Sequence, residues 1–266
     1  MRTYSTLGLT RRDRVLTITL NRPEELNAVN LQMHDDLADA LNFVATDEQS
    51  DIVVLTGAGR AFCAGADIEH LVRNAAAPER FDHDVRIAKR IVFAMLDLDK
   101  PVICKMNGPA IGLGATLALL CDVIYAAEGA KIGDPHVCMG LVAGDGGAAL
   151  WAQRIGLGRA KEYLLTGEPI TAKYAEQIGL VNHCVAASQL DDAVVGFCNR
   201  LQHGSMNAIR WTKVLLNLEL KRVAHSVMDA GIAYESITAR SADHREAVKA
   251  IQEKRRPVFC WDPNKL

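Results

Sequence analysis

The sequence predicts an α/β protein in which helices cover a mainly parallel sheet and the C-terminal region is helical. Segments typical of strands and helices alternate three times before residue 125, which favours parallel pairing. From about residue 145 the pattern becomes helical. A length of 266 residues suits one large core with a helical appendage. We therefore expect a core over residues 1–200 and a helical region over residues 201–266.

Hydrophobic periodicity places the individual elements. The alternation in RVLTITL predicts a half-buried strand at 14–20, and the short apolar run DIVVLTG predicts another at 51–57. Further strands are expected at 101–108 and within 122–133. Apolar residues at helical spacing predict helices in the first half at 31–46, 79–97 and 114–121. The second half is expected to form helices at 146–156, 158–166, 171–178 and 187–202, and several more to residue 254.

Composition excludes several classes of function. The net charge is only -2, and Lys and Arg gather only at 253–257, so no basic face is available for nucleic acid. Seven scattered cysteines without a CxxC motif predict neither a disulfide framework nor a zinc site, and we expect no metal. This cysteine usage suits a reducing, cytoplasmic compartment. The apolar run 108–121 is too short to cross a membrane, and no signal peptide is evident at the N-terminus.

Two glycine-rich turns could present backbone amides to a ligand. AFCAGAD (61–67) is a loop of small residues after a predicted strand. In NGPAIGLGATLALL (107–120), glycines flank Leu113 where a strand turns into a helix, whose first N–H groups have no intrahelical partner. Either turn alone is also common as a structural connector.

In the glycine-rich segment DPHVCMGLVAGDG (134–146), a histidine and an aspartate, His136 and Asp145, stand nine positions apart. With an unperturbed pKa of about 6.5, His136 can accept or donate a proton near neutral pH. Asp145, nine residues later, could orient the ring. The alternatives are a structural role for His136 and an N-cap role for Asp145 at the helix expected from 146.

Four segments together resemble the crotonase, or enoyl-CoA hydratase/isomerase, superfamily. They are LNRPEELNAVN, IVVLTGAGRAFCAGADI, KPVICKMNGPAIGLGATLALLCDVIYAAEGAKIGDP and RAKEYLLTGEPITAKYAEQIGLVN, which follow one another in family order. The resemblance implies a spiral of ββα units, an acyl-CoA thioester as substrate, and a helical C-terminal region that assembles a homotrimer or a dimer of trimers. No cofactor is implied, because coenzyme A is part of the substrate.

The resemblance also implies roles for individual residues. The backbone N–H groups of Ala66 and Leu113 would form an oxyanion hole for the thioester oxygen. Glu24 matches a position where many relatives carry a lysine near the nucleotide phosphates, so one favourable charge interaction is missing here. The positions matching the coenzyme A channel are Leu26, Ala28, Ala64, Asp67 and Ile68.

The catalytic positions depart from the hydratase pattern. Where family hydratases use two glutamates to hold and split water, this chain has Thr116 and His136. A narrower branch, 6-oxocamphor hydrolase, is similar at His136, Asp145 and Glu235, where it carries the residues that cleave a carbon–carbon bond with water. Glu235 could alternatively face solvent or a trimer contact.

Three functions therefore remain open. The first is an acyl-CoA enzyme of the hydratase/isomerase type, in which Ala66 and Leu113 stabilise an enolate and His136 with Asp145 handles water or protons. The second is a hydrolase that opens a cyclic or β-diketo acyl-CoA by carbon–carbon cleavage. The third is a non-catalytic relative that binds acyl-CoA.

Overall fold

A six-stranded sheet forms the base of the fold in the computed structural model, which describes residues 2–260. The strand order is β1-β2-β3-β4-β6-β9, with β1 antiparallel to β2 and every later pair parallel. Parallel neighbours require crossovers, which the intervening helices provide. The strands are β1 (Leu7–Arg12), β2 (Val15–Leu20), β3 (Ile52–Gly57), β4 (Val102–Met106), β6 (Val123–Ala127) and β9 (His183–Val185).

A second, three-stranded sheet has the order β5-β7-β8. Its strands are short: β5 (Ala110–Ile111), β7 (Lys131–Gly133) and β8 (Ile170–Thr171). An isolated bridge between Cys63 and Ala110 ties the loop after β3 to β5. This sheet therefore connects the AGAD loop with the segment that leads to His136.

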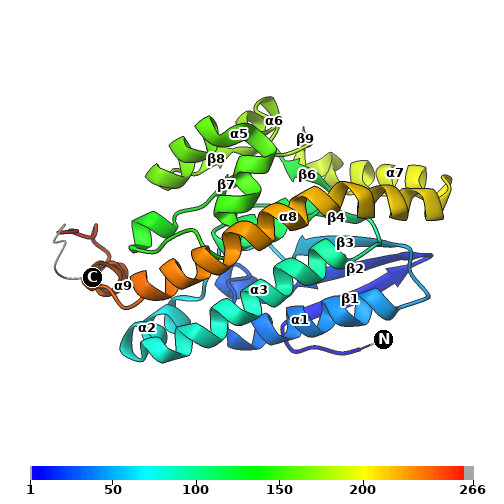
Figure 1. Cartoon of the computed structure of the whole chain (residues 1–266). Helices are drawn as coiled ribbons and strands as arrows, with labels where there is room; N and C mark the ends of the chain where they lie inside the picture. Colours follow the sequence, from blue (N-terminus) through cyan, green and yellow to red (C-terminus); the bar gives the residue numbers. More distant parts are fainter. Residues whose placement is uncertain (1, 261–266) are drawn as a thin grey trace.

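Three long helices, α1, α3 and α8, lie side by side across one face of the six-stranded sheet (Figure 1). The α-helices are α1 (Leu31–Thr46), α2 (Ile68–Ala76), α3 (Phe81–Asp97), α4 (Leu113–Leu120), α5 (Gly147–Thr166), α6 (Ala172–Gln177), α7 (Leu190–Gln202), α8 (Met206–Thr238) and α9 (Ala242–Gln252). Short 3-10 helices are η1 (Pro23–Glu25), η2 (Pro78–Arg80), η3 (His136–Met139) and η4 (Ala187–Gln189).

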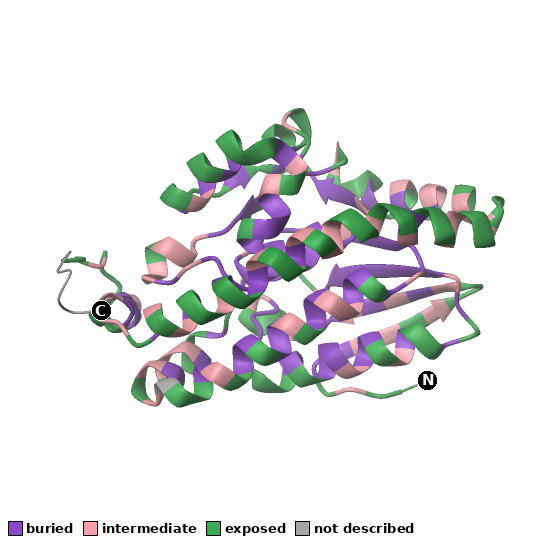
Figure 2. Cartoon of the chain, in the orientation of Figure 1, coloured by how far each residue is buried: buried purple, intermediate pink, exposed green. Residues whose placement is uncertain are grey.

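The main core lies between this sheet and the helices above it, where the buried faces meet (Figure 2). Leu16, Ile18 and Leu20 alternate along β2 on the inward face and are at most 1% exposed. Met33 and Leu37 of α1 pack against the same cluster one turn apart. The alternating apolar residues of β2 and the helically spaced apolar residues of α1 thus lie in one core.

Most predicted elements are confirmed within a few residues. The two helices expected at 146–156 and 158–166 are one run, α5, with a non-helical Gly156 (φ 77°, ψ 159°) between its halves. The sequence does not predict strands β1, β5, β8 and β9 or helix α2. The expected boundary near residue 200 stays a prediction, and residues 261–266 of that region lie outside the described part of the chain.

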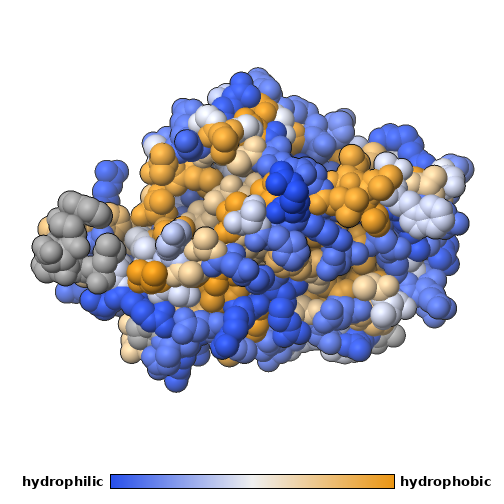
Figure 3. Space-filling model, in the orientation of Figure 1, coloured by the Kyte–Doolittle hydropathy of each residue, from blue (hydrophilic) through white to orange (hydrophobic). Residues whose placement is uncertain are grey.

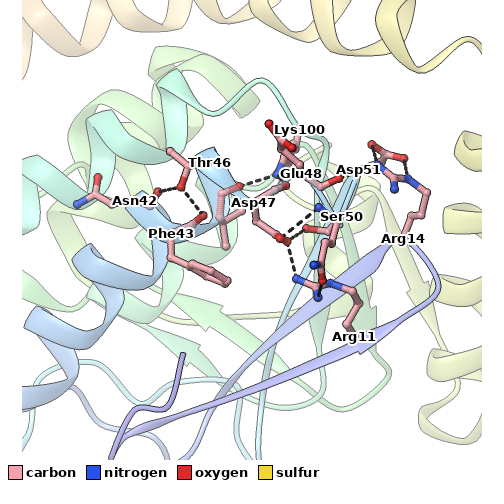
Figure 4. Close-up of polar contacts among 12 residues, drawn as sticks. Arg11, Arg14, Asn42, Phe43, Thr46, Asp47, Glu48, Ser50, Asp51 and Lys100 are labelled. Carbon is pink, nitrogen blue, oxygen red and sulfur yellow. Dashed lines mark hydrogen bonds and ion pairs between the residues drawn. The ribbon is translucent and has the colours of Figure 1, made fainter. Parts of the chain in front are cut away.

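A buried lysine fixes the C-terminal end of α1 (Figure 4). Lys100 is 3% exposed, and its ammonium donates hydrogen bonds to the carbonyl oxygens of Val44 and Asp47. A cation is favoured there because the last carbonyls of a helix have no intrahelical partner and carry partial negative charge. The Asp47 carboxylate accepts from Arg11 at 2.7 Å, which links this helix end to β1.

The outer face of α8 carries several exposed apolar side chains, and hydrophobic patches appear on this face of the molecule (Figure 3). The exposed apolar side chains of α8 include Trp211, Leu215, Leu216 and Leu218. Within residues 2–260, none of the helices combines the length and the apolar character needed to cross a bilayer.

Candidate active site

One cavity of about 270 Å³ receives residues from both glycine-rich turns and from the histidine segment. It lies between the AGAD loop, the start of α4, helices α2 and α3, and the inner end of α8. The residues around it that matter for chemistry are His34, Ala66, His70, Asn74, Asp84, Leu113, His136, Asp145 and Glu235. Every residue that the sequence predicted as catalytic or as an amide donor therefore borders the same space.

Glycines allow the two amide-bearing turns to touch. A Cβ at Gly65 would lie 2.9 Å from the Ile111 carbonyl oxygen, and one at Gly114 would lie 2.3 Å from that of Cys63. A side chain at either position would force the turns apart, because real Cβ atoms do not approach that closely. Gly112 also needs its residue type, since φ 54° with ψ -122° is open mainly to glycine.

The backbone N–H groups of Ala66 and Leu113 take no part in the neighbouring strand bridge or in the hydrogen bonds within α4. Val29 pairs with this loop through the Gly65 oxygen and the Asp67 nitrogen, so the Ala66 N–H points to the other side of the strand. Leu113 is the first residue of α4, where an N–H has no intrahelical acceptor. An oxyanion hole at these two N–H groups therefore stays a prediction that the local backbone pairing permits.

We expect Gly114→Ala to lower kcat at least tenfold, because the new methyl group would push α4 away from Cys63 and separate the two N–H groups. Removing a single donor of this kind typically costs about 10²- to 10³-fold in kcat. Steady-state kinetics test this against Gly158→Ala, whose Cβ would meet no atom within 4 Å. Equal activity of both variants would contradict the expected convergence of the amides.

The imidazole of His136 is held by Asp134. Asp134 follows directly after β7 and its side chain is completely buried, and its Oδ1 hydrogen-bonds His136 Nδ1. The sequence predicts that Asp145 orients the ring, whereas this bond holds the ring through Asp134 and the other nitrogen. The signal for Asp134 lay in the DPH spacing, which places a carboxylate two residues before the histidine at a strand end.

Two further carboxyl groups face the free side of the ring. His136 Nε2 lies 3.7 Å from Asp145 Oδ2 and 3.8 Å from Glu235 Oε1. Thr116 donates to Asp145 Oδ1 at 3.3 Å from the first turn of α4. The N-cap residue of helix α5 is Gly146, and no side chain caps this helix. Asp145 is therefore not its N-cap residue.

Glu235 reaches the cavity because α8 approaches the loop that carries Asp145. A Cβ at Gly144 would lie 2.3 Å from the Gly231 carbonyl oxygen. Thr238, one turn beyond Glu235, accepts from the Val142 amide at 3.2 Å. Glu235 is 3% exposed, which places it in the site rather than in solvent.

Burial and neighbouring charges shift the pKa values of this group. Burial opposes a charged imidazole, yet the carboxylates of Asp134 and Asp145 outweigh it and hold the pKa of His136 well above 6.5. Burial raises the pKa of Asp145, and burial together with Asp145 raises the pKa of Glu235 to about 8. At neutral pH the site thus combines an imidazolium, the Asp134 carboxylate and a protonated Glu235.

Glu235→Gln should stabilise the protein more at high pH than at low pH. The pKa of Glu235 is 4.5 in the unfolded chain and about 8 in the folded protein. The free energy of unfolding of the wild type therefore falls as pH rises between these values. We expect the difference in free energy of unfolding between Glu235→Gln and the wild type to grow by about 2 kcal/mol or more from pH 5 to pH 8.5. Denaturant unfolding at both pH values measures it; a constant gap would contradict the raised pKa.

The positions matching the coenzyme A channel divide into three groups. Ala64 and Ile68 border the cavity. Asp67 caps α2 and pairs with Arg22 at 2.9 Å, so its side chain is engaged structurally. Leu26 and Ala28 lie on the adjoining turn, where the Leu26 carbonyl accepts from the Ala64 amide at 3.1 Å.

The chain is similar to members of one protein family over nearly its whole length. The model of the enoyl-CoA hydratase/isomerase family matches residues 10–261. The chain is 35% identical to a 1,2-epoxyphenylacetyl-CoA isomerase of Escherichia coli, covering 92% of this chain and 94% of that one. It is 33% identical to a 2,3-dehydroadipyl-CoA hydratase of the same organism, covering 96% and 98%. A crystal structure of an enoyl-CoA hydratase/isomerase from Mycobacterium paratuberculosis superposes with a TM-score of 0.88 at 36% identity, covering 92% and 98%.

The fold and site define an acyl-CoA enzyme of the crotonase type. The chain belongs to the enoyl-CoA hydratase/isomerase family, which confirms the resemblance and the crotonase-type α/β fold predicted from the sequence.

Proposed function

We propose that this enzyme activates water against an acyl-CoA thioester whose carbonyl oxygen binds to the N–H groups of Ala66 and Leu113. The observation that carries the proposal is that both turns and the His136 imidazole open on one cavity. The ring also lies near both turns, because a Cβ at Gly112 would be 3.8 Å from His136 Cε1 and 4.0 Å from the Gly65 Cα.

In the leading form of this function, water adds across the double bond of an enoyl-CoA. Asp145 accepts a proton as the water oxygen bonds to the β carbon, and the π electrons move toward the thioester oxygen. The hole stabilises that developing charge. The α carbon then takes a proton from the imidazolium of His136, which Glu235 can reprotonate across 3.8 Å.

A second candidate is hydrolytic carbon–carbon cleavage. It is favoured by the presence of an imidazole and two carboxyl groups in place of the two glutamates of family hydratases. Water adds to a ketone β to the thioester, and the bond between the ketone carbon and the α carbon breaks. The electron pair becomes a thioester enolate held by the same hole. Asp145 takes the proton that the attacking water loses, and the α carbon takes a proton from the imidazolium of His136. The products are a carboxylic acid and the shortened or ring-opened thioester.

Two substrates separate these reactions. Loss of the enoyl thioester absorbance of crotonyl-CoA, with a 3-hydroxyacyl product, supports hydration. A ring-opened acid from a cyclic β-keto acyl-CoA, with one oxygen derived from labelled water, supports cleavage. Tight calorimetric binding of acyl-CoA without turnover on either substrate, or on a broad thioester panel, would contradict the proposal and favour a binding role.

We propose that neither reaction needs a metal or redox cofactor, with coenzyme A entering only as part of the substrate. The point needs testing because Asp134, His136 and Asp145 each offer a ligand atom within 4.8 Å of the others. His136 Nδ1, however, is engaged by Asp134 in the hydrogen bond that fixes the ring. Activity should survive dialysis against a chelator, and restoration by a divalent cation would contradict this part of the proposal.

We further propose assembly into a homotrimer or a dimer of trimers. The exposed apolar side chains of α8 support an interface between copies, because such patches on a soluble protein usually mark association. Light scattering after gel filtration tests the assembly, and a monomeric mass would contradict it.

A further inference from the structure

A second polar cluster borders the cavity, and neither form of the proposed chemistry uses it. It consists of His34 from α1, His70 and Asn74 from α2, and Asp84 from α3. The catalytic group comes from other elements, namely η3, the loop before α5, and α8. The two clusters therefore enter one space from different parts of the fold.

Asp84 is the centre of this second cluster. Its Oδ2 accepts from His70 Nε2 at 2.6 Å and from Asn74 Nδ2 at 2.5 Å. Burial alone would raise the pKa of Asp84, but the hydrogen bond from His70 lowers it. The cluster thus contains a buried carboxylate that keeps its charge.

His34 is unsatisfied. The residue is 7% exposed, and among the described residues neither of its ring nitrogens has a hydrogen-bond partner. Burial lowers the pKa of His34 to about 4, so the ring is neutral, with one N–H donor and one acceptor. A buried polar group without a partner costs stability, and a ligand that supplies the partner recovers it.

The surroundings restrict the chemistry of that ligand. Phe81, Val85, Ala88 and Leu71 supply an apolar wall around the polar cluster. A carboxylate on the ligand would meet the like charge of Asp84, which disfavours it. A neutral oxygen, by contrast, can accept from the imidazole N–H, and a hydroxyl could instead donate to the unprotonated ring nitrogen.

We propose that His34, with the His70–Asn74–Asp84 cluster, forms a specificity subsite that hydrogen-bonds a hydroxyl or ketone oxygen on the acyl chain of the thioester. This inference rests on the proposed function, because it takes the occupant of the cavity to be an acyl-CoA. It adds that the acyl group is oxygenated away from the thioester and uncharged there.

Calorimetric titration with six-carbon thioesters tests the subsite. The probes are hexanoyl-CoA, its 4-, 5- and 6-hydroxy derivatives, 5-oxohexanoyl-CoA and adipoyl-CoA. We expect at least one oxygenated neutral probe to bind about fivefold or more tightly than hexanoyl-CoA, as one added hydrogen bond allows. Adipoyl-CoA, with its terminal carboxylate, should bind more weakly than that probe.

Substitutions in the cluster test whether it causes the preference for oxygenated probes. His34→Leu should reduce the ratio between oxygenated and plain probes to about one, and His34→Gln, which keeps a donor and an acceptor, should restore part of it. Asp84→Asn should improve adipoyl-CoA relative to hexanoyl-CoA. His203→Leu, at an exposed position at the end of α7, is the matched control. Each ratio compares two ligands on one protein, so a general loss of stability cancels.

Three results would overturn the inference. Equal binding of all neutral probes to the wild type, or a preference that survives His34→Leu, would overturn the subsite alone. Failure of hexanoyl-CoA and every other probe to bind would overturn the proposed function and the subsite with it.

Discussion

His136→Ala is expected to lower kcat by about 10²- to 10⁴-fold on the substrate that the enzyme turns over, the range for losing a positioned acid or base. The imidazole is the only group described at the cavity that lies between three carboxyl groups, with Asp134 on one nitrogen and Asp145 and Glu235 on the other. Its removal would interrupt proton transfer in either form of the proposed reaction.

The same substitution should leave substrate binding nearly intact, because in the proposed complex backbone amides, and not the imidazole, would hold the thioester oxygen. Steady-state kinetics and acyl-CoA titration measure the two effects separately. His225→Ala is the control, since that ring packs against Phe93 on the outside of α8, with 4.4 Å between ring centroids. Full activity of His136→Ala would remove the imidazole from the mechanism.

Asp134→Asn is expected to have the second largest effect, about 10²-fold or more in kcat. A neutral amide no longer stabilises the imidazolium or selects the ring's protonation state, the loss that follows when the orienting carboxylate of a catalytic histidine is removed. Because the Asp134 carboxylate helps to hold the pKa of His136 high, this pKa should fall in the variant.

The pKa change distinguishes a positioning role from simple damage to the fold. Imidazole resonances of His136 followed by NMR over pH give the titration directly, and the pH dependence of kcat should shift in the same direction. Asp191→Asn, which removes a surface partner of Lys105, is the control. An unchanged His136 titration together with unchanged kcat would show that Asp134 does not set the state of the ring.

The regular parts of the fold could be predicted from the sequence because they bury one periodic face. RVLTITL and the helix from residue 31 show this pattern clearly, and both lie in the core as expected. β1 was missed because its outer positions are polar and it gains its identity from pairing with β2. β9 has only three residues, too few to show a period.

The site was predictable where function rests on local sequence and less so where it rests on tertiary approach. The two glycine-rich turns and His136 stood out as motifs, and the structure brings them to one cavity. The position of Glu235 depends on contact between Gly144 and Gly231, which lie 87 residues apart and show no sequence signal of their pairing. His34, His70 and Asp84 converge from three helices and carried no motif at all.

A crystal structure with acetoacetyl-CoA bound tests the central claim most directly. The account predicts the thioester oxygen within about 3 Å of both the Ala66 and Leu113 nitrogens, the usual hydrogen-bond distance. The ketone and α carbon should face His136 Nε2. A thioester oxygen bound by neither amide, or an acyl group directed away from the imidazole, would contradict it.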